Sequence, residues 1–269
     1  MKLEGKTIWI TGASSGIGEG MARVFHREGA SLALSARRED ELERVKATCT
    51  GGPGRVIVVP LDVVDSAARE AATEEVLSEF SGLGVLVNNA GISQMSLALE
   101  TSEEVERLVM EVDYFAPVAL TKLVLPRMID AGGGHIVVTS SVAGKHAVPY
   151  HTTYCAAKHA LHGYFDTLRV EHLDDNVDIT LLVIAGVKSH VYERALRGDG
   201  SPANATEMDA RQGVDATDCG DRVADAIVNR EREVVFGFEP SLQALKIKDS
   251  DPEAFIQRMH NAMAFLGGQ

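Results

Sequence analysis

The first thirty residues contain the feature that most restricts the fold of this chain. The apolar run Lys6 to Thr11 leads directly into a glycine turn, Gly12 to Gly18, and an apolar helical pattern continues to about Glu28. The glycines permit a tight turn, a close approach of backbone to a phosphate, and close packing of helix on strand. The pattern predicts a dinucleotide site at the start of the helix. The residues expected to contact the dinucleotide are Gly12, Ser14, Ser15, Gly16, Ile17 and Gly18.

The spacing of this turn differs from the usual G-x-G-x-x-G, so a plain flexible loop is the alternative interpretation. Its position between a strand and a helix argues against that alternative.

The second predicted strand, Ser31 to Ser35, ends close to two arginines. A site for NAD places an acidic side chain here, about twenty residues beyond the last glycine, on the ribose 2′-hydroxyl. Arg37 or Arg38 can instead hold the 2′-phosphate of NADP through charge-assisted hydrogen bonds. The sequence therefore predicts NADP(H) as the cofactor. Both arginines also suit the exposed surface of a helix from Glu39 to Ala47, which is the alternative.

Two further strands end in residues that suit a cofactor site. Val56 to Asp62 predicts a third strand, and we expect Asp62 and the following Val63 near the adenine. Val85 to Val87 predicts a fourth strand, and the amides and glycine that follow it can brace neighbouring strands beside the cofactor. Helix capping by Asp62 or Asp65 and an ordinary turn after the fourth strand are the alternatives. The expected contacts after the fourth strand are Asn89, Ala90 and Gly91.

Tyr154 and Lys158 have a spacing that points to proton transfer. A separation of four in a helix places both side chains on one face, one turn apart. A lysine ammonium nearby favours the phenolate and lowers the tyrosine pKa from about 10. Ser141 lies upstream, at the end of an apolar run from His135, and ligands of open α/β sheets bind at such strand ends. An ordinary helix surface is the alternative, and the strand context favours catalysis.

The rest of the chain alternates helices with strands. Long helices are predicted from about Ser102 to Asp130, interrupted at Pro117, and from Thr152 to Leu173. A polar, weakly periodic stretch over residues 188–216 is typical of a lid above a site. The other expected elements are a strand at Asp178 to Ala185, a helix near Asp218 to Asn229, a strand at Glu233 to Gly237, and a helical tail over 240–269 with a helix from about Pro252 to Phe265.

This order predicts an α/β fold with one doubly wound, Rossmann-like parallel sheet of about seven strands and helices on both faces. The 269 residues show no composition break, which favours a single domain over 1–269. The net charge of −13 argues against partners such as nucleic acid or an anionic membrane. Without a transmembrane-length or signal-type apolar run, we expect a cytoplasmic protein. Three widely spaced cysteines give no metal or disulfide pattern.

Three motifs between about Leu3 and Gly237 resemble those of the short-chain dehydrogenase/reductase family. They are T-G-x-x-x-G-x-G from Thr11, N-N-A-G from Asn88, and the set Ser141, Tyr154 and Lys158. The resemblance implies that Tyr154 is the general acid/base and that Ser141 binds the substrate oxygen. It also implies that Lys158 holds the nicotinamide ribose while lowering the tyrosine pKa, and that Asn88 has a structural role near the cofactor. Through its two long helices, such a chain forms a homodimer or homotetramer.

Two positions depart from the family pattern. After strand six the family often has Pro-Gly and then a threonine that binds the carboxamide, whereas this chain has Ala185-Gly186 and Lys188-Ser189-His190. We expect cofactor contacts from Gly186, Val187 and Ser189.

The second departure is Asp113, which stands where the family usually has an asparagine of its proton relay. We expect it to pair through water with the Lys158 ammonium or to stay protonated. The alternative is that it faces a helix neighbour or solvent and has no relay role.

These observations predict an NADP(H)-dependent oxidoreductase that interconverts a ketone or aldehyde and an alcohol by hydride transfer, with Tyr154 as acid/base. The alternative is a nucleotide-sensing NADP-binding protein with little catalysis, which the departures at Asp113 and Ala185 favour slightly. The pocket should be fairly apolar and suit a moderately large small-molecule alcohol or ketone better than a charged sugar. The expected substrate contacts are Ser141, Gln94, His146 and Tyr192.

Overall fold

The computed structural model describes residues 1–188, 193–204 and 213–266, with side chains to residue 263, and its centre is a seven-stranded sheet. Every neighbouring pair of strands is parallel, in the order β3-β2-β1-β4-β5-β6-β7. This confirms the predicted Rossmann-like sheet. The strands are β1 (Thr7–Thr11), β2 (Ser31–Ser35), β3 (Val56–Val58), β4 (Val85–Asn88), β5 (Gly134–Ser141), β6 (Val177–Ala185) and β7 (Glu233–Gly237).

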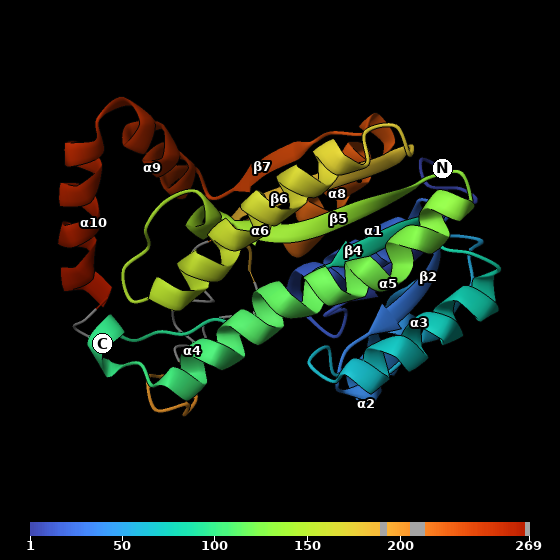
Figure 1. Ribbon diagram of the computed structural model, residues 1–269, viewed down its shortest axis with the longest axis horizontal. Helices are drawn as coiled ribbons and strands as arrows, with labels where there is room; N and C mark the ends of the chain where they lie inside the picture. The colour runs from blue at the N-terminus through green and yellow to red at the C-terminus, as the bar shows by residue number, and fades with distance from the viewer. Residues whose placement is uncertain (189–192, 205–212, 267–269) are drawn as a thin grey trace.

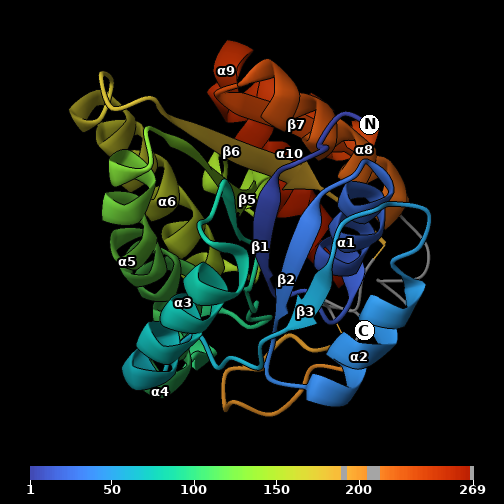
Figure 2. The ribbon, with the colours of Figure 1, turned by 90° about the vertical axis from the view of Figure 1, so that its right-hand side faces the viewer.

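Helices cover both faces of the sheet (Figures 1 and 2). Successive residues of β1 point to opposite faces, so Ile8 and Ile10 join the core under α1 while Trp9 joins the core under α6. Both faces are therefore buried, as a parallel sheet requires. One face carries α1 (Gly16–Arg27), α2 (Glu39–Thr48) and α8 (Ala216–Asn229), and the other carries α3 (Ser66–Phe80), α4 (Glu103–Met110), α5 (Ala116–Asp130) and α6 (Thr152–Glu171).

The strand order reverses between β1 and β4, and the glycine turn lies at that point. From β1 the chain builds outward to β2 and β3, then returns to place β4 on the other side of β1. A side chain at Gly12 would put its Cβ 2.8 Å from the Cα of Ala90, and one at Gly18 would put it 2.3 Å from the Gly12 carbonyl oxygen. The chain ends of β1 and β4 can approach this closely only with glycine. The crevice outside these strand ends is where ligands of such sheets bind.

The long helix before β5 is interrupted at a different place from the predicted Pro117. The interruption is a π-helical turn, η2 (Glu111–Phe115), between α4 and α5. Pro117 lies in the first turn of α5, where a missing N–H leaves no helical hydrogen bond unmade. The π-helical turn contains Asp113, whose side chain is buried. Such turns often occur at functional sites.

The helical tail that the sequence predicts over 240–269 contains a second helix besides the one whose bounds are predicted. It is α9 (Glu239–Ser250), and it precedes the expected α10 (Pro252–Leu266). Pro240 lies in the first turn of α9, so it begins the helix instead of preventing it. On α10, Phe255 is buried while Met259 and Met263 are half-buried. No helix within the described ranges is both long enough and apolar enough to cross a membrane.

The described part of the expected lid, residues 193–204, packs on the loop that follows β4. The Leu196 N–H donates to the Ser93 carbonyl at 2.8 Å, and the Met95 N–H donates to the Leu196 carbonyl at 2.7 Å. The Ser102 N–H donates to the Gly198 carbonyl at 2.8 Å. This segment is thus attached by its backbone at two places beside the strand ends.

Candidate active site

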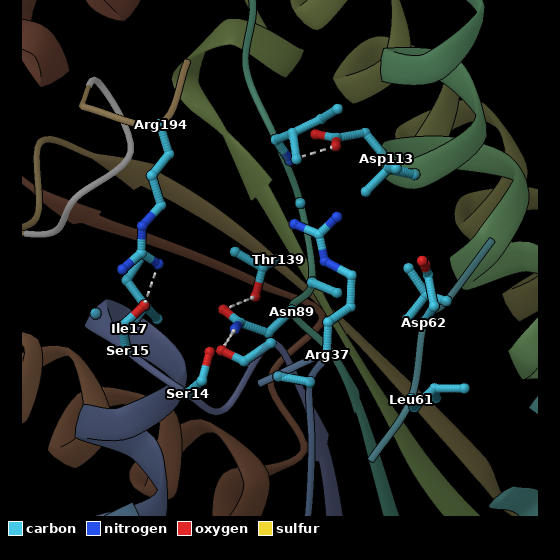
Figure 3. A pocket seen from close by; sticks show the side chains of 18 of the residues that line it. Ser14, Ser15, Ile17, Arg37, Leu61, Asp62, Asn89, Asp113, Thr139 and Arg194 are labelled. Carbon is cyan, nitrogen blue, oxygen red and sulfur yellow. Dashed lines mark hydrogen bonds between the residues drawn. The ribbon is translucent and has the colours of Figure 1, made fainter. Parts of the chain in front are cut away.

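A pocket of about 280 Å³ lies at the carboxyl ends of the strands (Figure 3). It is lined by most of the residues that the sequence singled out for cofactor binding or catalysis. These predicted residues are Gly12, Ser14, Ser15, Gly16, Ile17, Arg37, Arg38, Asp62, Val63, Asn89, Ala90, Gly91, Asp113, Tyr154 and Lys158. The further lining residues are Ala36, Leu61, Ile92, Val112, Thr139 and Arg194.

Thr11 and Asn89 hold together the three strand ends that form the floor of the pocket. The Thr11 hydroxyl donates to the Val87 carbonyl at 3.2 Å and accepts from the Asn89 N–H at 3.0 Å. The Asn89 amide donates to the Thr11 carbonyl at 3.1 Å and accepts from the Thr139 hydroxyl at 3.2 Å. Asn89 therefore links β1, β4 and β5.

Asn88, to which the resemblance gave the structural role, points elsewhere. Its amide donates to the Thr121 hydroxyl of α5 at 3.0 Å. The bracing of strand ends at the cofactor site thus falls to the second of the two asparagines.

Arginines surround the end of the pocket near β2. Arg37 and Arg38 are exposed, and the Arg37 side chain extends into the pocket in Figure 3. An Arg38 guanidinium nitrogen lies 3.4 Å from the Ser14 hydroxyl. Arg44 donates to the Ser14 carbonyl at 3.3 Å and forms an ion pair with Glu19 at 2.9 Å. This end of the pocket presents positive charge where a dinucleotide would carry its adenosine phosphate.

Asp62 lies on the opposite wall of this end of the pocket. The capping role considered for it belongs to Asp65, whose carboxylate accepts from the Ala68 N–H at the start of α3. Among the hydrogen bonds of the described chain, the Asp62 carboxylate accepts only from the Val64 N–H, at 3.2 Å.

Tyr154 and Lys158 share one face of α6, as their spacing predicts. The Lys158 ammonium donates to the Thr139 carbonyl at 3.0 Å and lies 5.4 Å from the centroid of the Tyr154 ring. The Ser141 hydroxyl hydrogen-bonds the Tyr154 phenol and also accepts from the Ala143 N–H at 3.1 Å. Serine, tyrosine and lysine thus meet at the end of β5, although Ser141 is not among the lining residues.

The pKa of the Tyr154 phenol is raised in this structure. Burial is the main cause, the negative charge of Asp113 adds to it, and the hydrogen bond with Ser141 opposes it. The expectation that Lys158 would lower this pKa is therefore wrong for the structure as it stands. The main reason is burial, and the Lys158 ammonium, which lies 3.1 Å from the Asp113 carboxylate, is not among the groups that shift this pKa.

Asp113 is buried at the centre of this arrangement, with 1% of its surface exposed. One carboxylate oxygen accepts from the Ile92 N–H at 2.7 Å, and the other contacts Lys158. Burial raises the Asp113 pKa, opposed by the charge of Lys158 and by the Ile92 hydrogen bond. The alternative that Asp113 faces solvent is excluded. Its pairing with Lys158 is direct and not through water as expected.

Two of the predicted substrate contacts are buried outside the pocket lining. Gln94 is fully buried, and its side chain accepts from the Tyr154 N–H at 3.0 Å and donates to the Thr152 hydroxyl at 3.2 Å. This geometry favours a positioning role for Gln94 at the start of α6. His146 is also buried, with Nδ1 2.8 Å from the Ala147 carbonyl oxygen and its ring 5.3 Å from the Phe255 ring of α10.

The residues after β6 extend away from the pocket. Gly186 accepts from the Val214 N–H at 3.0 Å, and Val187 forms an isolated parallel bridge with Val214. Neither residue is among those that line the pocket. Ser189 and Tyr192, the other predicted contacts in this stretch, lie outside the described residues.

Sequence reasoning missed two polar residues of the pocket. Thr139 supplies the carbonyl that holds Lys158, and its place two residues before Ser141 in β5 could have identified it. Arg194 enters from the segment 193–204, and its guanidinium donates to the Ser15 hydroxyl at 3.0 Å. No sequence pattern pointed to Arg194, because its contact joins residues far apart in the chain.

Comparison with known proteins gives consistent similarities. The family model described as short chain dehydrogenase matches residues 6–198. The human protein "Dehydrogenase/reductase SDR family member 7" is 39% identical over 246 residues, which are 90% of this chain and 73% of that protein. A short chain dehydrogenase/reductase from Burkholderia phymatum in complex with NAD gives a TM-score of 0.84 at 26% identity, covering 94% of this chain and 96% of that one.

An alcohol dehydrogenase from the archaeon Thermococcus sibiricus, complexed with 5-hydroxy-NADP, gives a TM-score of 0.74 at 27% identity. The match covers 87% of this chain and 96% of that chain. These two similar structures hold different nicotinamide dinucleotides.

Proposed function

The chain belongs to the short-chain dehydrogenase family of oxidoreductases, and on that basis we propose that it is an NADP(H)-dependent enzyme that interconverts a ketone or aldehyde and an alcohol. Hydride transfer is general to the family. The observation that carries the proposal is the meeting of Ser141, Tyr154 and Lys158 beside the pocket at the glycine turn. Tyr154 is assigned the role of general acid/base.

The close approaches at Gly12 and Gly18 support a fit to the dinucleotide. They bring the main chain of the turn against Asn89 and Ala90 and leave the start of α1 open to the pocket. Main-chain N–H groups at a helix start bind pyrophosphate without any side chain. The nicotinamide, when bound, supplies or accepts the hydride.

The side chains of this protein handle the proton. In reduction the Tyr154 phenol donates its proton to the carbonyl oxygen, and in oxidation the phenolate removes it from the alcohol. We assign the Ser141 hydroxyl, which acts on the Tyr154 phenol, the role of donating to the same oxygen as negative charge develops there. The raised Tyr154 pKa keeps the phenol protonated at neutral pH, which suits the donor role needed for reduction.

Lys158 and Asp113 form the support behind this proton donor. Lys158 is fixed between the Thr139 carbonyl and the Asp113 carboxylate, and we assign it to the nicotinamide ribose. Asp113 acts on Tyr154 through charge, because its carboxylate both offsets the ammonium and raises the phenol pKa. We include Asp113 in the proton relay on this ground.

The preference for NADP(H) over NAD(H) is supported by the charges near the end of β2. Ala36 offers no carboxylate to repel a 2′-phosphate, and Arg37 extends into the pocket from the next position. A guanidinium binds a phosphate dianion by charge-assisted hydrogen bonds.

We also propose a homodimer or homotetramer in the cytoplasm. Apolar side chains are exposed on η2 and at the end of α6, with Phe115 at 51%, Val170 at 75% and Leu173 at 71%. Burial of such side chains against a second copy would stabilise the assembly. Light scattering coupled to size-exclusion chromatography gives the number of copies.

The test is a substrate screen. The purified protein is incubated with NADPH or NADH and a panel of apolar ketones and aldehydes, while loss of the reduced nicotinamide is followed by absorbance. We expect turnover with NADPH on at least one moderately large apolar carbonyl. Tight NADPH binding without turnover on any member of the panel, or of the matching alcohols with NADP, would instead support the nucleotide-sensing alternative.

A further inference from the structure

We propose that Arg194 binds the pyrophosphate of the bound dinucleotide from the side opposite the glycine turn. The inference rests on the proposed function only in requiring that a nicotinamide dinucleotide occupies the pocket. It adds a cofactor-binding residue from a part of the chain, segment 193–204, that the sequence had placed on the substrate side.

The first observation is where the Arg194 side chain points. Arg194 is among the residues that line the pocket, and Figure 3 shows its guanidinium directed at Ser15 and Ile17. The Arg194 guanidinium donates to the Ser15 hydroxyl at 3.0 Å, and this bond joins residues 194 and 15, both of which line the pocket. The guanidinium thus lies over the turn that forms the start of α1.

The second observation concerns Ser15 itself. Ser15 is the N-cap residue of α1, yet within the described residues its side chain makes no capping hydrogen bond. Its hydroxyl instead accepts from Arg194. The N–H groups in the first turn of α1 are therefore not satisfied by the Ser15 side chain, and such groups are the site for a dinucleotide pyrophosphate. Arg194 points at this same place.

The chemistry favours exchange of this hydrogen bond for phosphate. Ser15 offers the guanidinium one neutral acceptor, whereas pyrophosphate offers several charged oxygens. Hydrogen bonds between a guanidinium and a phosphate are shorter and stronger, and the planar fork can make two at once. Arg194 and the start of α1 would then hold the pyrophosphate between them.

The segment that carries Arg194 is already attached to the body of the protein. Its hydrogen bonds to Ser93, Met95 and Ser102 fix the backbone on the loop after β4. A side chain at Gly198 would put its Cβ 2.0 Å from the Glu100 carbonyl oxygen, so the segment also packs tightly there. Binding through Arg194 therefore needs the ordering of one side chain and not of a whole loop.

Pyrophosphate is common to NADPH and NADH, and this sets Arg194 apart from Arg37. Loss of Arg194 should weaken both dinucleotides by the same factor, whereas loss of a 2′-phosphate contact should weaken NADPH alone. Adenosine 2′-monophosphate, which has no pyrophosphate, should be unaffected by the loss of Arg194.

The experiment compares Arg194→Met with the unmodified protein by titration calorimetry against NADPH, NADH and adenosine 2′-monophosphate. We expect both dinucleotides to bind about tenfold more weakly or worse, and adenosine 2′-monophosphate to bind equally well. Arg194→Lys keeps the charge but loses the planar fork of the guanidinium. Its affinity for both dinucleotides should lie between those of the unmodified protein and Arg194→Met. Arg197→Met is the matched control, because Arg197 is an exposed arginine of the same segment outside the pocket lining.

The outcomes separate cleanly. Unchanged affinity of Arg194→Met for both dinucleotides overturns the proposal, and so does a loss confined to NADPH, which would place Arg194 at the 2′-phosphate. Thermal unfolding without cofactor checks that Arg194→Met and Arg194→Lys remain folded. If Arg194→Met does not fold, the affinities of Arg194→Lys alone test the proposal. If the unmodified protein binds neither dinucleotide, the proposed function fails before any variant is made.

Discussion

The two ends of the pocket use charge in different ways. At the adenosine end, formed by Arg37, Arg38 and Asp62, all three side chains are exposed to solvent. At the catalytic end, Asp113 and Lys158 are 1% and 5% exposed and touch each other. Exposed charges attract a ligand and are screened by salt, whereas buried charges change the protonation of their neighbours. We therefore expect the exposed charges to act on cofactor binding and the buried charges to act on the protonation of Tyr154.

The largest effect is expected at the catalytic end. Tyr154→Phe removes the only atom of this side chain that can donate a proton, so turnover should fall by about a thousandfold. The affinity for NADPH should stay within a few-fold, because the ring and its packing remain. Steady-state kinetics and calorimetry measure the two quantities. Near-normal turnover would remove Tyr154 from the mechanism.

The adenosine end should show the next largest effect, on binding alone. Arg37→Ala is expected to weaken NADPH by about tenfold to a hundredfold, the range for loss of a charge-assisted hydrogen bond, and to leave NADH nearly unchanged. Arg107→Ala is the control, because Arg107 is 77% exposed and lies on α4 outside the pocket lining. Equal affinities of the unmodified protein for NADPH and NADH would contradict the assigned preference.

Asp113→Asn should change the pH dependence of alcohol oxidation more than it changes the maximal rate. Oxidation requires the phenolate, and in the native protein burial and the Asp113 charge raise the Tyr154 pKa. The amide removes that negative charge and no longer offsets Lys158, so the alkaline rise of oxidation should move to lower pH by about one unit. The limb of the pH profile that belongs to Asp113 should disappear. Profiles that overlay would show that Asp113 has no relay role.

The smallest expected effect is that of salt on cofactor affinity. Salt should act on the exposed charges of the adenosine end and not on the buried charges of the catalytic end. Raising the salt concentration from about 50 mM to about 500 mM is expected to weaken the binding of NADPH a few-fold, because salt screens the exposed arginines. The binding of NADH should weaken by less. The limb of the pH profile that belongs to Asp113 should keep its position, since the contact of Asp113 with Lys158 is shielded from solvent. An equal salt response of both cofactors would argue that the 2′-phosphate is not held by exposed charge.

Local patterns predicted the sheet well and also marked residues that the structure brings together in the pocket near β2. The glycine turn, β2 and β7 were readable because each depends on neighbouring residues: alternation of apolar side chains, glycines at a turn, arginines after a strand. The same holds for the helical face shared by Tyr154 and Lys158. These features need no knowledge of what lies opposite them in space.

The catalytic end was predicted less fully, because its properties come from contacts between distant segments. The sign of the Tyr154 pKa shift depends on burial and on Asp113, which reaches the site from a π-helical turn that no local pattern marked. Gln94 was taken for a substrate contact, although its partners on α6 lie far along the chain. Arg194 was missed for the same reason.

The position of β1 inside the sheet has a consequence for how the chain is made. On one side of β1, Thr7 pairs with Ser31 of β2. On the other side, Ile8 pairs with Val85 of β4, which is made much later. A ribosome releases β1, β2 and β3 first, and until β4 follows them the nascent sheet keeps one open edge of unpaired main-chain groups. Until β4 emerges, the edge of β1 is therefore open to pairing with another chain, and β4, β5 and β6 each present such an edge in turn until the next strand is made.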